Sequence, residues 1–429
     1  MIVILYTTKY RLGGDKFTRI ANTLAAEKKS SAEVLCTAVE SKRDVLSVLF
    51  KIKQENKFIQ ELHFIGHSGM YGPMFGMIEY PEQFSPHEWR TMDIPFEKNA
   101  AAYFRCCRSA RWFARFFANT FYIPAYGYFW YTTFSGSPEK YIKDAGAEKP
   151  LYAIGCKGMK SHGITGSLKK YAGMQEAEQM IRFDPEPAMP DRSYDRVAAL
   201  YADVFSDIKV RKDEWKWMHK HFPDNLNQLT MLDVGCGNGA LLQSLSGKIK
   251  EGIGVDNSPG MIDVANASKD TFPNLQFHTI SGPSLPLPDQ SVDLIISLLS
   301  FRYLDWDPIM AEFSRIMKPG GKMLIIDMVA APVKYSELPR FFFSKIKYYF
   351  QRIRNPKYYG ALKKMVNDPD WKKMVQYNPM RAQHEYRWYL ESRFPGRKAQ
   401  VINIGWSSRI LAFDTGDFEK IKPLTLTYP

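Results

Sequence analysis

One ten-residue stretch constrains the fold of this chain more than any other. Residues 231–240 read Met-Leu-Asp-Val-Gly-Cys-Gly-Asn-Gly-Ala, an apolar strand pattern that runs into an acid, Asp233, and three glycines. A helical pattern with Leu241, Leu242 and Leu245 on one side follows directly. This order of strand, glycine turn and helix brings the backbone close to a nucleotide-like ligand, because glycine leaves no Cβ in the ligand's way. The stretch therefore predicts an α/β fold with a ligand at the turn.

Two later stretches extend this pattern. The strand pattern over residues 252–256 ends in Asp256, 23 residues after Asp233, and an acid about 20 residues on is placed to hold ribose hydroxyl groups. Residues 317–321, Met-Lys-Pro-Gly-Gly, precede a further strand pattern. Taken in series, the three stretches resemble the class I S-adenosylmethionine (SAM) dependent methyltransferases, in particular the subgroup that methylates small molecules, quinones and lipids. The resemblance covers roughly residues 190–429.

The resemblance implies a Rossmann-like domain and SAM as its cofactor. Ser281 stands where family members often carry an acid that contacts the adenine amino group. Because a sulfonium methyl group is already activated, transfer mainly needs alignment, and no single catalytic residue is compelled. Tyr303, Arg302 and Asp327 are candidates by position, with ordinary packing as the open alternative for each. The implied cofactor contacts are Asp233, Gly235, Cys236, Gly237, Gly239, Asp256, Asn257, Ser281, Gly282 and Ser300.

The first half of the chain has its own alternation of strands and helices. Such alternation predicts a small parallel-sheet α/β domain with helices on both faces. We place this domain at residues 1–183, a proline-rich linker at 184–192 and the methyltransferase domain at 193–429. Ser41 is the expected N-cap of the second helix. The predicted strands are 2–8, 32–39, 61–66, 100–105 and 123–133, and the predicted helices are 15–29, 41–58 and 110–121.

Two reactive side chains follow consecutive predicted strands of this first domain. His67 follows strand 61–66, and Cys107 follows strand 100–105. Because the carboxyl ends of parallel strands share one edge, we expect the two side chains at that edge, where ligands bind. This layout is similar to caspase-like (clan CD) cysteine peptidases and implies a His67–Cys107 pair. An active cysteine hydrolase, a non-catalytic relative and an unrelated α/β domain remain open.

A basic and aromatic segment interrupts the methyltransferase half. Residues 331–400 hold 16 Lys and Arg against five acids, a local net charge of +11 within a total of +13. Residues 338–354 contain no acid between their ends, and their aromatics follow helical spacing, which is typical of a helix on a membrane surface. Nucleic-acid binding, which we consider unlikely because no recognised module accompanies the charge, and a core-facing helix are the alternatives. An apolar substrate pocket is expected here, with a wall formed by Trp371, Tyr377, Tyr386, Trp388 and Tyr389.

Cysteine usage and the N-terminal pattern indicate the setting. The five cysteines have no metal-ligand spacing, which predicts no metal site and fits a reducing compartment. Residues 1–6 form a strand pattern rather than a signal peptide. We therefore expect a cytoplasmic protein, peripheral on an anionic membrane, that methylates a hydrophobic small molecule or lipid. The alternatives are a polar metabolite, protein or nucleic-acid acceptor, or a regulatory protein whose first domain binds a partner. The oligomeric state stays open.

Overall fold

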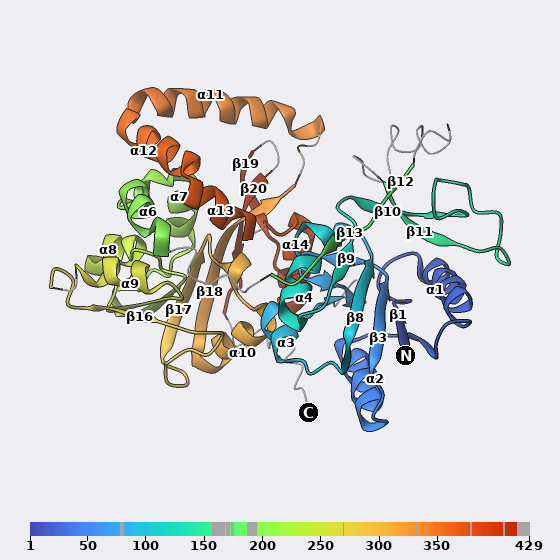
Figure 1. Cartoon of the computed structure of the whole chain (residues 1–429). Coiled ribbons are helices and arrows are strands. Elements are labelled where there is room, and N and C mark those ends of the chain that lie inside the picture. Colours follow the sequence, from blue (N-terminus) through green and yellow to red (C-terminus); the bar gives the residue numbers. More distant parts are fainter. Residues whose placement is uncertain are drawn as a thin grey trace. The chain divides into compact units, whose positions relative to one another are not determined.

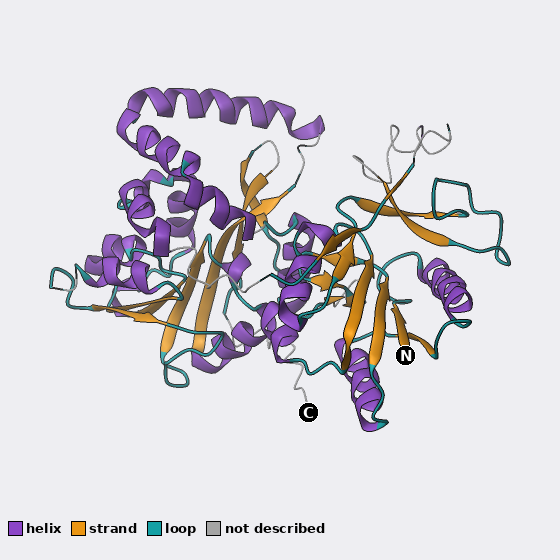
Figure 2. Ribbon diagram, viewed as in Figure 1, coloured by secondary structure: helices purple, strands orange, loops and turns teal. Residues whose placement is uncertain are grey.

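The chain divides into two compact units, unit 1 (Met1–Ala188) and unit 2 (Met189–Pro429). The boundary lies within the expected linker 184–192, of which residues 187–192 are outside the described residues. Each unit has its own sheet with helices beside it (Figure 1, Figure 2). The computed structural model describes residues 1–77, 81–156, 168, 172, 176–186, 195–268, 270–331, 333, 335–377, 380–405 and 408–417, without the side chains of 373, 376 and 377.

Unit 1 is organised around a sheet of six strands, counted over its described residues, in the order β13-β9-β8-β3-β1-β2. Neighbouring strands are parallel except β13, which is antiparallel to β9. This confirms the predicted parallel sheet. The strands are β1 (Ile2–Tyr6), β2 (Val34–Ala38), β3 (Ile59–Ile65), β8 (Phe96–Arg105), β9 (Ala125–Gly127) and β13 (Ile181–Phe183).

Helices pack on both faces of this sheet. Helix α1 (Gly14–Lys28) buries its apolar side against Ile2 and Ile4 of β1. The opposite face of β1, with Val3 and Leu5, packs in one cluster with the three other helices. Ser41 caps α2 as predicted, because its side chain accepts a hydrogen bond from the Asp44 backbone N–H. The three helices are α2 (Lys42–Gln54), α3 (Pro86–Thr91) and α4 (Phe113–Phe121).

The predicted fifth strand of unit 1 was wrong. Residues 123–133 form β9 in the large sheet and then the start of β10 (Tyr131–Ser135), which belongs to a separate antiparallel sheet with β11 (Tyr152–Cys156) and β12 (Ala177–Glu178). The chain leaves the large sheet at Tyr128, whose backbone N–H and C=O bond to Ser109 and Ala110 instead of a strand. The sequence also did not predict α3 or the short hairpins β4 (Ser68–Gly69) with β5 (Gly72–Pro73) and β6 (Phe75–Gly76) with β7 (Pro81–Glu82).

Unit 2 is built on a sheet of seven strands, counted over its described residues, in the order β16-β15-β14-β17-β18-β20-β19. The first five are parallel, and β20 runs antiparallel to β18 and β19. The strands are β14 (Thr230–Val234), β15 (Glu251–Asp256), β16 (Leu275–Thr279), β17 (Val292–Leu298), β18 (Met317–Ala330), β19 (Gln400–Ile404) and β20 (Ser408–Asp414).

Helices cover both faces of the unit 2 sheet. One face packs against α7 (Lys212–His221), α8 (Ala240–Leu245) and α9 (Pro259–Asn266). The other face packs against α10 (Trp306–Ile316) and α14 (Gln383–Arg393).

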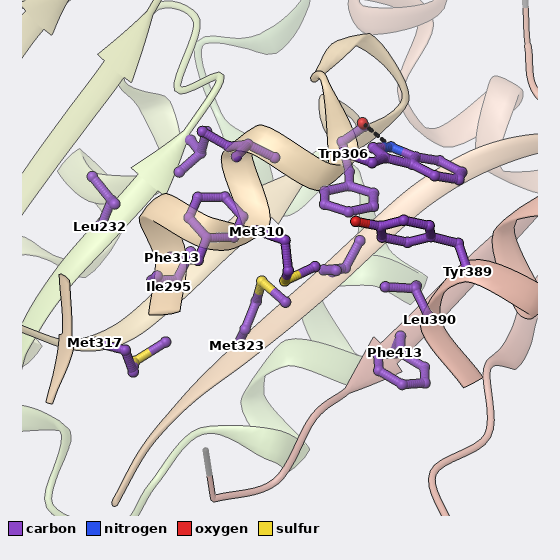
Figure 3. Packing of buried hydrophobic residues seen from close by; sticks show 14 of the residues in the cluster. Leu232, Ile295, Trp306, Met310, Phe313, Met317, Met323, Tyr389, Leu390 and Phe413 are labelled. Carbon is purple, nitrogen blue, oxygen red and sulfur yellow. Dashed lines mark hydrogen bonds between the residues drawn. The ribbon is translucent and has the colours of Figure 1, made fainter. Parts of the chain in front are cut away.

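The prediction of a substrate-pocket wall was wrong for two aromatic side chains of α14. Tyr386 and Tyr389, expected to wall a substrate pocket, are buried in the core of unit 2 at 1% and 7% exposure. Figure 3 shows the Tyr389 ring beside Trp306, and the two ring centroids are 4.5 Å apart. Because α14 packs against the sheet together with α10, these rings complete the core instead of lining a pocket.

The basic segment forms a run of helices that includes α11 (Leu338–Arg354), α12 (Pro356–Asn367) and α13 (Pro369–Tyr377). Helix α11 has the bounds that the sequence predicted, and Phe341 is its one buried residue. Helix α12 packs on α6 (Ala198–Phe205) through a small apolar cluster of its own. Across the described residues, none of the helices combines the length and apolar character that crossing a bilayer requires.

Candidate functional site

The glycine turn after β14 is shaped by a close approach between backbone and side chain. Gly235 has φ +75°, and a Cβ added to it would lie 2.3 Å from Cβ of Ser300. Gly237 also has a positive φ, +53°, but the nearest atom to its added Cβ is Cε1 of Tyr201 at 3.6 Å. Glycine is therefore required at 235 for packing, and at 237 by the left-handed backbone.

Asp256, at the end of β15, accepts hydrogen bonds from the backbone of this turn and of the residues after β15. Its Oδ2 accepts a hydrogen bond from the Gly237 N–H at 2.9 Å, and its Oδ1 accepts one from the Ser258 N–H at 2.9 Å. Burial raises the pKa of this carboxyl above its usual range. A carboxylate has about four acceptor positions, so further acceptor capacity remains for a ligand hydroxyl, as the sequence predicts.

Asp233 presents a buried acceptor atom to the site. The side chain is 2% exposed, and its Oδ1 has no hydrogen-bond partner within the described part of the chain. Burial, and then the charge of Asp256, raise the pKa of Asp233 to about 8. A buried polar atom without a partner is unusual and points to a missing donor. The ammonium group of SAM is such a donor, so the Asp233 carboxyl fits the expected cofactor.

A pocket opens at this point, with charges of both signs on its wall. Asp233 is the acidic residue of the lining, and Arg211 is the cationic one. The Arg211 guanidinium lies 3.9 Å from the ring centroid of Phe205, which fixes its position. Most of the remaining wall is apolar. A zwitterionic amino-acid group beside an apolar or aromatic group matches this lining. The lining residues are Tyr201, Phe205, Ile208, Arg211, Asp233, Gly235, Cys236, Asn238, Ala240, Leu241 and Leu298.

Helix α6 forms the cover of this pocket. Nδ2 of Asn238, in the glycine turn, donates a hydrogen bond to the Phe205 carbonyl at 3.3 Å. Tyr201 lies over Gly237 from the same helix. Among its described neighbours, α6 packs in turn against Tyr358 and Leu362 of α12. The basic segment therefore packs against α6, the helix that covers the pocket.

The predicted cofactor residues are not all brought together. Cys236 lines the pocket and is buried, and Gly239 is the N-cap of α8. Ser300 is buried behind the turn, where its Oγ donates to the Val234 carbonyl at 2.5 Å. Asn257, Ser281 and Gly282 are exposed and lie outside the pocket lining. Sequence analysis missed Asn238 and Arg211, although Asn238 stands inside the glycine motif itself.

The three candidate residues near the acceptor, Tyr303, Arg302 and Asp327, form one hydrogen-bonded network around the buried Asp327. Arg302 Nη1 donates to Asp327 Oδ1 at 2.7 Å, and its Nη2 donates to the Tyr303 hydroxyl at 2.7 Å. The Tyr386 hydroxyl donates to Asp327 Oδ2 at 3.2 Å, and Asp327 is fully buried. Burial raises the pKa of Asp327, opposed by the Arg302 charge. This arrangement ties the loop after β17 to β18 and to the core, which favours the packing role.

In unit 1 the two reactive residues lie at adjacent strand ends. The Cys107 sulfur is 3.2 Å from the Thr132 hydroxyl and accepts a hydrogen bond from the Thr132 N–H at 3.3 Å. The Ser68 hydroxyl donates to the Cys107 carbonyl, so the two loops adjoin. His67 Nε2 instead bonds to the Leu12 carbonyl at 3.0 Å, and burial lowers the pKa of the imidazole. The two loops thus meet while the imidazole and the thiol hold other partners.

Comparison with known proteins bears on unit 2. Residues 232–325 match the family model of the methyltransferase domain. This stretch runs from β14 through the glycine turn and the Asp256 strand into β18. The match supports SAM as the cofactor of unit 2 and the Rossmann-like expectation for its sheet.

Relatives match over parts of the chain. An uncharacterized methyltransferase of Schizosaccharomyces pombe is 33% identical over 112 residues, covering 26% of this chain and 43% of the relative. The ubiquinone/menaquinone biosynthesis C-methyltransferase UbiE of Campylobacter jejuni is 26% identical over 162 residues, covering 36% and 65%. A tRNA(Thr) (cytosine(32)-N(3))-methyltransferase of Saccharomyces cerevisiae is 26% identical over 182 residues, covering 36% and 29%. The chain thus spans less than two thirds of the length of these relatives.

A solved structure, a SAM-dependent methyltransferase from Aquifex aeolicus, is 18% identical with a TM-score of 0.33 and covers 53% of this chain and 100% of its own.

Proposed function

We propose that unit 2 is a SAM-dependent methyltransferase that acts on a hydrophobic small molecule or lipid at the cytoplasmic surface of a membrane. The observation that carries the catalytic part is the pocket at the glycine turn, which is lined by Arg211 and by Asp233, whose Oδ1 has no hydrogen-bond partner among the described residues. Opposite charges at that place suit the ammonium and carboxylate groups of the cofactor.

The chain's own residues bind and align in this proposal. SAM, when bound, supplies a methyl group on a sulfonium that is already activated for displacement. Asp233 and Arg211 hold the amino-acid end, Asp256 fixes the turn and accepts from the ribose, and α6 excludes water from above. The acceptor atom attacks the methyl carbon while the carbon–sulfur bond breaks, and any proton on the acceptor leaves to solvent or to a neighbouring base.

The hydrophobic acceptor class rests on two lines of support. The exposed side of α11 is aromatic and basic together, as a surface that meets lipid would be. Two relatives are named for quinone chemistry, the C. jejuni protein described above and a demethylmenaquinone methyltransferase of Lysinibacillus sphaericus, 29% identical over 155 residues, covering 34% of this chain and 65% of the relative. The yeast tRNA methyltransferase supports the alternative, a nucleic-acid acceptor.

A labelling experiment separates these acceptors. The purified full chain is incubated with methyl-labelled SAM and a total extract of the source cells, and the products are partitioned between organic solvent and water. Label in the organic phase is expected. Label in the aqueous phase or in precipitated macromolecules would replace the lipid acceptor by a polar metabolite, protein or nucleic acid. Asp256→Ala is the control, because loss of its bonds to Gly237 and Ser258 should weaken SAM binding.

Unit 1 carries a second candidate function. Its two loops after β3 and β8 adjoin through the Ser68 bond to Cys107, and the thiol already accepts an N–H from Thr132. We propose that this edge is a caspase-like site that binds or cleaves a partner, with Cys107 as nucleophile and His67 as its base once the imidazole exchanges its bond to Leu12. Labelling by an electrophilic cysteine probe that Cys107→Ala abolishes, and His67→Ala slows, would support an active site. Equal labelling in His67→Ala would leave partner binding alone.

A further inference from the structure

Helix α11 leaves a continuous apolar face uncovered. On a helix of 3.6 residues per turn, six of its exposed apolar side chains fall within a sector of about 120°. Contiguous exposed apolar surface of this kind marks an interaction site, whereas single exposed residues do not. These side chains are Phe342, Phe343, Ile346, Tyr349, Phe350 and Ile353, each between 57% and 69% exposed.

Basic side chains border this apolar sector on both sides. Lys345 and Arg352 lie along one edge of the sector, and Lys347 and Arg354 lie along the other. All four are exposed, and residues 338–354 contain no acid. Long basic side chains beside an apolar face can reach headgroup phosphates while the apolar face enters the acyl region.

The opposite side of α11 is attached to unit 2. Phe341 is buried, and Arg340 Nη2 donates to the Val401 carbonyl at 2.9 Å. At the edge of the apolar sector, Lys347 Nζ donates to Asp213 of unit 2 at 2.6 Å. Just before the helix, Glu337 pairs with the buried Arg409. Figure 1 shows α11 lying along the border of unit 2, with α12 leading back toward α6. The apolar sector is therefore held outward by contacts on the other side.

From this geometry we infer that α11 binds in the plane of an anionic lipid bilayer. The inference rests on the proposed function only for the choice of a lipid-soluble acceptor, and it names the surface that meets the membrane. A second copy of the chain fits less well, because a self-complementary contact through α11 would bring its basic edges together, and α11 itself carries no acid to pair them. Nucleic acid fits less well, because Ile346 and Ile353 occupy the middle of the face where phosphates would lie.

The position of α11 also concerns the cofactor pocket. Helix α12 follows α11 directly and packs on α6, which covers the glycine turn. A bilayer bound by α11 is therefore connected through α12 to α6, the helix that covers the pocket. A lipid-soluble acceptor would then approach unit 2 from the side on which α6 lies.

Vesicle binding tests the inference without SAM or acceptor. The full chain is sedimented with vesicles of phosphatidylcholine mixed with phosphatidylglycerol, and separately with phosphatidylcholine alone. We expect stronger binding to the mixed vesicles that falls with added salt. Arg352→Gln with Arg354→Gln should lower the partition coefficient by roughly 25-fold, since each basic residue near an anionic leaflet contributes about a fivefold factor. Phe343→Ser with Phe350→Ser should lower it by at least about tenfold on both kinds of vesicle.

Matched substitutions elsewhere serve as controls. Lys248→Gln with Lys250→Gln removes the same charge from exposed positions of unit 2. Phe50→Ser with Phe58→Ser removes the same rings from positions that are 62% and 56% exposed. Neither control should change vesicle binding, and thermal melting should show every variant folded.

Three results would overturn the inference. The first is equal vesicle binding by the α11 variants, their controls and the unchanged chain. The second is binding to an RNA or DNA oligonucleotide, but not to vesicles, that the Arg352 and Arg354 changes abolish. The third is a dimer, seen by sedimentation, that Phe343→Ser with Phe350→Ser converts to monomers in a chain that does not bind vesicles. Methyl transfer plays no part in these assays, so failure of the proposed activity would be seen separately.

Discussion

Asp233 and Asp256 lie near the carboxyl ends of the adjacent parallel strands β14 and β15, and burial together with the charge of Asp256 raises the pKa of Asp233 to about 8. The Asp233 carboxyl is therefore mostly protonated at neutral pH before the cofactor binds. A cation at Oδ1 would favour the ionised form and would have to displace that proton.

SAM affinity should consequently depend on pH. Below about pH 8, binding to the carboxylate requires release of a proton, so the affinity should rise by up to about tenfold per pH unit as the pH increases, and should level off above about pH 8. Calorimetric titration of the full chain with SAM across this range measures the slope. In Asp233→Asn the slope should disappear and the affinity should be low throughout. A slope that persists in Asp233→Asn would assign the proton to another group.

The contact between Gly235 and Ser300 predicts a steric double-mutant effect. Gly235→Ala adds a Cβ that lies 2.3 Å from Cβ of Ser300 at φ +75°, so overpacking and left-handed strain should lower the free energy of unfolding by about 3 kcal/mol. Adding Ser300→Gly removes the clash but not the strain and should recover about half of the loss. Urea unfolding measures both.

Gly237→Ala is the matched control for this cycle. Its φ is +53°, but the nearest atom to the added Cβ is 3.6 Å away, so we expect only the strain, about 1 kcal/mol. Equal losses at the two glycines would mean that the close approach of Ser300 does not limit the turn.

The pair of Arg302 and Asp327 predicts a pH-dependent loss of stability. Arg302→Met removes the charge that opposes the raised pKa of the fully buried Asp327. At about pH 8 the ionised Asp327 carboxylate would be buried without the Arg302 guanidinium, which typically costs about 3 kcal/mol. The folded-state pKa then lies further above the unfolded value, so the folded chain holds a proton that the unfolded chain has lost, and stability falls as pH rises through that window.

Urea unfolding at about pH 5 and about pH 8 therefore distinguishes this role from ordinary packing. The loss should be smaller at the lower pH, where a larger fraction of Asp327 is protonated, and Arg302→Met with Asp327→Asn should recover stability at the higher pH. A loss that is equal at both pH values would indicate lost packing of the Arg302 side chain alone.

The predictable part of the site is the part encoded by local spacing. The glycines and the two acids of β14 and β15 follow each other closely in the sequence, and the hydrogen bond from Gly237 to Asp256 closes the turn that this spacing predicts. Arg211 could not be found in this way, because it reaches the pocket only when η3 (Ile208–Val210) and α6 fold over the turn. Asn238 lies inside the motif, but its role depends on the Phe205 carbonyl of the cover.

The incorrect predictions arose where tertiary packing overrides local pattern. Tyr386 and Tyr389 have the amphipathic spacing of a pocket wall, but α14 packs on the sheet beside Trp306 and buries both rings. Residues 123–133 read as one strand because their apolar character is continuous, yet contacts with Ser109 end β9 at Gly127. Helix α11, by contrast, has its predicted bounds because little of it packs against other parts of the chain.

Arg211 is expected to recognise the amino-acid group of the cofactor. Arg211→Gln should weaken SAM binding by about tenfold or more, because it removes the cationic residue that lines the pocket together with Asp233. The same substitution should leave binding of 5′-methylthioadenosine, which lacks the amino-acid group, nearly unchanged. Competition calorimetry with both ligands measures the difference. Equal weakening for both would show that Arg211 acts by supporting Phe205 and the cover, not by contacting the ligand.

Independence of the two units can be tested at Cys107. The thiol is held within unit 1 by Thr132, while the pocket lies within unit 2, so Cys107→Ala should leave SAM binding and methyl transfer unchanged while it abolishes labelling by a cysteine-directed probe at that residue. Thr132→Val is the companion variant: it removes the hydroxyl but keeps the N–H bond to sulfur, and should alter only the labelling rate. Loss of methyl transfer in a folded Cys107→Ala chain would instead show that unit 1 acts on the methyltransferase site.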